Sequence, residues 1–90
     1  MKMSEAILKG MERFPVQAFG AYRKGDDAAC AMACANWAMA GITYGLPIMN
    51  REGRMADKFL LEYGIGPYEL NDRYEFPRDV IAGMFAAIGE

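Results

Sequence analysis

The stretch that decides the fold is Ala28–Asn50, AACAMACANWAMAGITYGLPIMN, which carries no charged side chain. Its first part, residues 28–40, consists almost wholly of strong helix formers and small residues. Apolar groups cover the whole circumference of that predicted helix, interrupted only by Asn36. Because a helix that is apolar on all sides belongs in the middle of a bundle, we expect a buried central helix over residues 28–40 that ends at Gly41.

Amphipathic segments on both sides predict the helices that surround this centre. Their expected bounds are Ser4–Arg13, Arg51–Tyr63, Pro67–Arg73 and Pro77–Ile88. Ser4 and Asn50 are the expected N-caps of the first two, and Gly64 is the expected end of the second. The expected core positions of the three longer helices are Ile7, Leu8, Met11, Phe14, Met55, Phe59, Leu60, Tyr63, Val80, Ile81, Met84, Phe85 and Ile88.

The connections are read from turn-forming and β-favouring residues. Val, Phe and Tyr around Gly20 predict an extended segment near residues 16–22. Residues 23–27 are predicted to form a turn that supplies an aspartate as the N-cap of the central helix. Residues 45–47 are predicted to form a loop. The predicted fold is therefore a single all-α domain, residues 1–90, with four to five helices around the central alanine-rich helix.

Charge and composition exclude several classes of function. The net charge of −2 comes from interspersed charges of both signs, and no basic patch for nucleic acid is visible. The uncharged run is long enough to span a membrane but is rich in alanine and contains glycine and proline, so we expect no membrane contact. The N-terminus has no apolar signal region, and there are two cysteines and no histidine. These features favour a cytoplasmic protein.

The two cysteines form the first candidate constellation. Cys30 and Cys34 are four residues apart on the expected central helix, which suits neither a relaxed disulfide nor a four-ligand zinc site. We expect two buried, poorly reactive thiols; the alternative is a thiol or metal site completed by another chain.

Carboxylates form the second candidate constellation, in the series Glu69, Asp72, Glu75 and Asp79, which we expect to be a solvated face with helix caps rather than a cation site. With no histidine and no phosphate-binding glycine motif, we expect no catalytic residue, no cofactor, no metal and no enzymatic activity.

Asn36 and Trp37 are candidates for structure or for contact with a partner. A buried Asn36 needs hydrogen-bond partners, and we expect it to reach a loop carbonyl or the edge of the bundle; the alternative is that it fixes helix register or meets another chain. Trp37 anchors either the core or an interface, and we favour the core.

Several short motifs together resemble a family of small uncharacterised proteins from bacteria and their phages. The motifs are Gln17 followed by Phe19-Gly20-Ala21-Tyr22, then Cys30-Ala31-Met32, and Asn71-Asp72 ahead of the last helix. That family shows G-A-[YF], C-A-x-G-A and N-D before T/S-x-x-E-[IV]. This chain departs from the pattern at Ala33 and Phe76. The resemblance implies a small helical domain without an established activity, with Gly20 in a tight backbone, Cys30 in the core and Asn71-Asp72 as a turn.

The leading functional hypothesis is an accessory or adaptor protein of prophage origin that acts through protein–protein contact, with a homodimer as one form of that contact. The alternative is a nucleic-acid-associated regulator that uses the two C-terminal helices as a helix–turn–helix-like unit, and the third is the thiol or metal site. The candidate interaction or motif positions are Gln17, Gly20, Tyr22, Cys30, Asn36, Trp37, Asn71 and Asp72.

Overall fold

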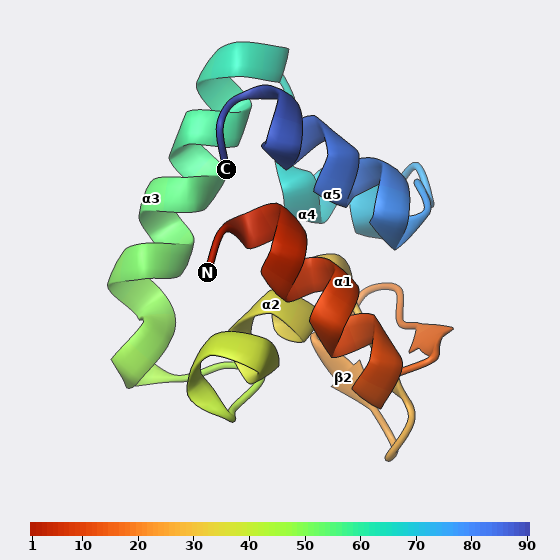
Figure 1. Cartoon of the computed structure of the whole chain (residues 1–90). Coiled ribbons are helices and arrows are strands. Elements are labelled where there is room, and N and C mark those ends of the chain that lie inside the picture. The colour runs from red at the N-terminus through yellow and green to blue at the C-terminus, as the bar shows by residue number, and fades with distance from the viewer.

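A computed structural model describes residues 1–90 and contains five helices and three two-residue strands. In chain order they are α1 (Met3–Arg13), β1 (Val16–Gln17), β2 (Arg23–Lys24), β3 (Ala28–Ala29), α2 (Ala31–Ala40), α3 (Leu46–Tyr63), α4 (Pro67–Asp72) and α5 (Arg78–Ala87). Figure 1 shows α3 along one side of the molecule, α1 in the middle, and the strands at the far edge from α3. The helical bundle is confirmed, but the protein is mostly α rather than all-α because of the small sheet.

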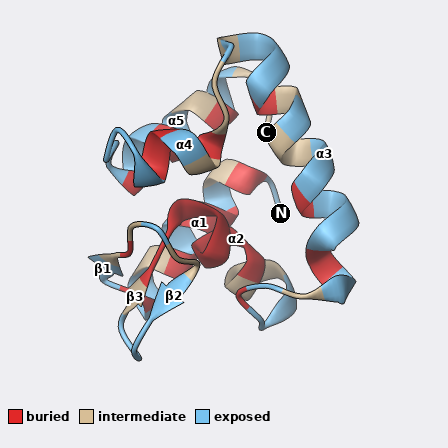
Figure 2. Cartoon of the chain, turned by 180° about the vertical axis from the view of Figure 1, so that it is seen from behind, coloured by how far each residue is buried: buried red, intermediate tan, exposed pale blue.

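The alanine-rich segment forms the centre of the core. Every residue from Ala29 to Asn36 is buried, and α2 packs most extensively against α1 (Figure 2). The two helices approach unusually closely, because a Cβ added to Gly10 of α1 would lie 2.1 Å from the carbonyl oxygen of Cys34 in α2. The prediction of a buried central helix is therefore confirmed for residues 31–36, whereas residues 37–39 are half-buried and Ala40 is exposed. A glycine on the neighbouring helix makes the close packing sterically feasible.

The start of the central helix was predicted wrongly. Ala28 and Ala29 form β3, which lies between β1 and β2, parallel to the first and antiparallel to the second. These tertiary backbone hydrogen bonds override the helix propensity of two alanines. The helix is capped by Cys30, whose Sγ accepts from the backbone N–H of Ala33 at 3.4 Å, and not by an aspartate of the preceding turn.

The third helix begins earlier than predicted. α3 starts at Leu46 and includes Asn50, the expected N-cap, as well as part of the expected loop at residues 45–47. Pro47 is compatible with this start because the first turn of a helix needs no donor from its backbone nitrogen. Gly41 and Gly64 end α2 and α3 in the left-handed conformation, as predicted.

Two details of the outer helices also differ from the prediction. The N-cap of α1 is Lys2, and Ser4 instead donates from both its backbone N–H and its Oγ to the carbonyl of Glu90, so the two ends of the chain meet. Leu8, Leu60 and Val80 were expected in the core but are between 43% and 49% exposed. The buried positions of α1 are Met3, Ala6, Ile7 and Gly10.

Candidate functional site

A buried asparagine joins three segments of the chain at one point. Asn71 Oδ1 accepts from the backbone N–H of Ala31, in the first turn of α2, at 3.1 Å, and from Gln17 Nε2 at 2.8 Å. Its Nδ2 donates to the Ala18 carbonyl at 2.9 Å and to Asp72 Oδ1 at 2.7 Å. Asn71 and Asp72 were predicted to form a turn; they are instead the last two residues of α4. Asn71 thus caps α2 from a distant segment.

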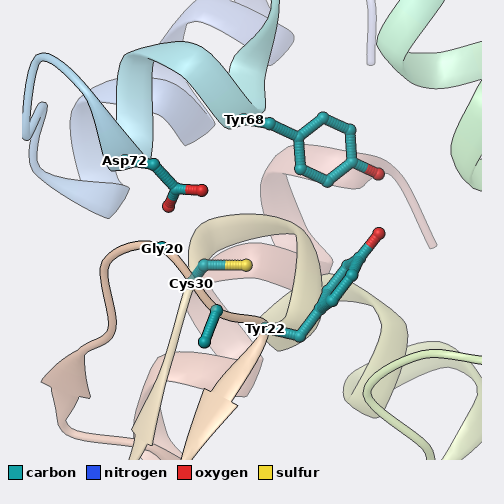
Figure 3. Close-up of a pocket in the computed structure, with 6 residues that line it drawn as sticks. Gly20, Tyr22, Cys30, Tyr68 and Asp72 are labelled. Carbon is teal, nitrogen blue, oxygen red and sulfur yellow. The ribbon is translucent and has the colours of Figure 1, made fainter.

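A cavity of about 150 Å³ lies beside this network. Its lining residues are Gly20, Ala21, Tyr22, Cys30, Tyr68 and Asp72. In Figure 3 the Asp72 carboxylate and the Cys30 sulfur lie on one side, and the rings of Tyr22 and Tyr68 lie on the other. Four of the predicted positions line the cavity, and Gln17 and Asn71 join them through hydrogen bonds, so six of the eight predicted positions converge here.

The rings of Tyr22 and Tyr68 form the aromatic wall of the cavity, and a buried carboxylate contacts this wall. Glu52 of α3 is only 7% exposed, and its Oε1 accepts a hydrogen bond from the Tyr68 hydroxyl. Burial, and then this bond to Glu52, raise the pKa of Tyr68, and burial raises the pKa of Tyr22. Both phenols are therefore neutral at physiological pH.

The wall continues outwards to Tyr44 in the α2–α3 connection. The rings of Tyr22 and Tyr44 are stacked with centroids 5.7 Å apart, and the Tyr68 ring meets Tyr22 edge-on at 6.0 Å. Tyr44 is 65% exposed, so this stack links the cavity wall to the molecular surface.

The thiols lie in surroundings that disfavour ionisation. Burial raises the pKa of Cys30 to about 11. Burial also raises the pKa of Cys34, which is fully buried, although the nearby guanidinium of Arg78 acts in the opposite direction. Since the thiolate is the reactive form, neither cysteine is activated in this fold.

Asn36 and Trp37 do not line the cavity, and each makes its contacts elsewhere in the chain. Asn36 is buried, and its Nδ2 donates to the carbonyl of Thr43 at 2.9 Å, which confirms the expected bond to a loop. Trp37 packs against the core, with its ring edge-to-face with Phe14 at 6.0 Å.

Sequence reasoning missed two buried charged residues. Arg78 is 5% exposed, and its guanidinium donates to the carbonyls of Phe14, Ala29 and Pro15 at 2.7, 3.1 and 3.0 Å. A cation in the first turn of a helix opposes the helix dipole, and this anomaly could have marked Arg78 as held by other groups. Glu52 could have been found because it interrupts the inner stripe of α3 between Ile48 and Phe59.

The four carboxylates of the expected solvated face are all exposed: Glu69, Asp72, Glu75 and Asp79. The chain contains no group of three or more histidine, cysteine, aspartate or glutamate side chains arranged to hold a metal ion. Asp72 is distinguished from the others because it also lines the cavity.

Comparison with known proteins adds no relative: neither a protein-family model, a curated protein nor a solved structure matches this chain. None of the helices combines the length and the apolar character that crossing a bilayer requires.

Proposed function

We propose that this chain is a small cytoplasmic accessory protein that acts through protein–protein contact at the corner between α2 and α3. One observation carries the proposal: large apolar side chains gather on the surface of this uncharged connection. They are Ile42, Tyr44, Leu46 and Met49, which are 37%, 65%, 83% and 56% exposed. We call these four residues the corner patch.

A second copy of the chain is the proposed occupant. If each fully exposed side chain is given on the order of 200 Å², as for a tyrosine, the exposed fractions of the four residues sum to roughly 500 Å² for the corner patch and roughly 1,000 Å² for two copies. This area lies at the lower limit for a specific interface, of about 1,000 Å². In a two-fold dimer the same patch meets itself, and a patch without charges does so without like-charge repulsion.

Size-exclusion chromatography with light scattering tests the proposal. We expect a concentration-dependent dimer that Leu46→Glu converts to monomer. Leu61 of α3 is 86% exposed but lies outside the corner patch, so Leu61→Glu is the matched control and should leave the dimer intact. Circular dichroism verifies that both variants are folded. A monomer at every concentration up to about 1 mM, or equal effects of the two substitutions, would contradict self-association through this patch.

The alternatives receive less support from the side chains that they require. A helix–turn–helix-like use of α4 and α5 depends on Arg73 and Arg78, but Arg78 is buried and Arg73 lies 3.4 Å from Glu69. A thiol or metal site depends on Cys30 and Cys34, which are both buried. The resemblance to small bacterial and phage proteins stays a prediction about origin, and it is compatible with an accessory role.

A further inference from the structure

The size of the cavity sets the scale of a ligand. Its volume of about 150 Å³ matches that of an engineered protein cavity that binds benzene. Two of its lining residues, Gly20 and Asp72, are exposed, so the cavity opens to solvent. It therefore suits a compact molecule of about the size of benzene, and it is too small for a nucleotide or a folded peptide.

The charges of the lining residues indicate the charge of a suitable ligand. Asp72 is the only charged lining residue, and none of the lining residues is basic. Glu52 lies behind the rings as a second carboxylate and takes part in no ion pair; the ion pairs of the chain are Arg23–Asp26, Lys58–Glu90 and Arg73–Glu69. Two carboxylates without a basic partner favour a positive charge between or beside them.

The aromatic wall sets the chemical class. Neutral phenol rings present a negative face to a cation, and such contacts strengthen when water is excluded. Tyr22 and Tyr68 lie opposite Asp72 across the cavity (Figure 3). An inorganic cation would need several oxygen ligands, whereas the lining offers one carboxylate and much apolar surface.

We propose that this cavity binds a small organic cation of the alkylammonium type, with its charged head near Asp72 and its alkyl groups against the rings of Tyr22 and Tyr68. This site is separate from self-association through the corner patch, although the Tyr22–Tyr44 stack joins the two regions.

The test is a titration of the full chain with choline, followed by amide chemical shifts in NMR spectra at constant ionic strength. The matched neutral probe is 3,3-dimethylbutanol, which replaces the quaternary nitrogen of choline by carbon. Ethanolamine, titrated in parallel, separates a preference for a quaternary head from one for a primary head. We expect choline to shift the amides of the lining residues and to bind at least about ten-fold more tightly than the neutral alcohol.

Two variants with the same change in net charge separate the site from general electrostatics. Asp72→Asn should weaken choline binding about two- to five-fold and leave the binding of the alcohol unchanged. Glu62 is exposed on α3 outside the cavity, so Glu62→Gln should change neither. An asparagine at position 72 keeps a side-chain oxygen that can accept from Asn71, and Glu62 is exposed, so both variants should fold. Equal binding of choline and the alcohol, no shift at the lining residues, or equal effects of the two substitutions would overturn the proposal.

Discussion

Replacement of Gly10 by alanine tests the close packing of α1 on α2. The added Cβ would lie 2.1, 2.5 and 2.6 Å from the carbonyl oxygen, carbonyl carbon and Cα of Cys34. These are backbone atoms, so the helices must separate by more than an ångström to restore an ordinary contact. Overpacking of this kind costs about 1–3 kcal/mol or more. Alanine gains about 1 kcal/mol in helix propensity, which offsets only part of a cost at the upper end.

We expect Gly10→Ala to lower the free energy of unfolding by about 1–2 kcal/mol, the upper part of the overpacking cost less the gain in helix propensity, out of the roughly 5–13 kcal/mol typical of a domain of this length. This loss corresponds to a fall in Tm of about 5–15 °C. Urea denaturation followed by circular dichroism measures the first quantity, and a thermal melt measures the second.

The chain provides matched controls for this substitution. Gly53 in α3 and Gly83 in α5 are exposed helical glycines, and a Cβ added to either meets no atom within 4 Å. Gly53→Ala and Gly83→Ala should therefore gain about 0.5–1 kcal/mol from helix propensity alone. If Gly10→Ala were as stable as these two variants, the close approach of α1 and α2 would be refuted.

Three further predictions concern the buried polar groups. Arg78→Met should cost about 2–4 kcal/mol in urea denaturation because it removes the donor of the Phe14 and Pro15 carbonyls, and Arg78→Lys should restore less than half of the loss; a loss under about 1 kcal/mol would contradict this role. Asn71→Ala should cost about 2–4 kcal/mol and accelerate hydrogen exchange of the Ala31 amide, whose partner it removes; unchanged exchange would count against the cap. The Cys30 thiol, with its pKa raised by burial from 9.0 to about 11, stays protonated in the folded chain while it ionises in the unfolded one. Stability should therefore fall by about 2–3 kcal/mol between pH 9 and pH 11 and less steeply in Cys30→Ser, with equal slopes as the refuting result.

The sequence predicted the helical core well because helix propensity, apolar character and glycine stops agree there. Residues 31–40 and the ends at Gly41 and Gly64 follow from local chemistry alone. The strand β1 falls within the extended segment predicted near residues 16–22. The strand β3 could not be predicted, because two alanines have no β-propensity and pair only when distant segments supply their hydrogen bonds.

The sequence identified most residues of the candidate site, but it did not show that they lie together in the folded chain. Gln17, Gly20 and Asp72 are far apart in the sequence, and their proximity depends on the packing of α4 beside the strands. Tyr68 was not singled out, because a lone tyrosine in a short helix has no distinguishing pattern. Its role depends on Glu52, which lies 16 residues earlier in the sequence and meets it only in the folded chain.

The position of Arg78 near the end of the chain has a consequence for biosynthesis. Arg78 binds the carbonyl of Phe14, 64 residues earlier, and that of Ala29, 49 residues earlier. A ribosome delivers those carbonyls long before it delivers the guanidinium that satisfies them. The N-terminal part of a nascent chain therefore lacks these hydrogen bonds until translation has almost finished. A chain truncated before Pro77 should be degraded quickly by proteases.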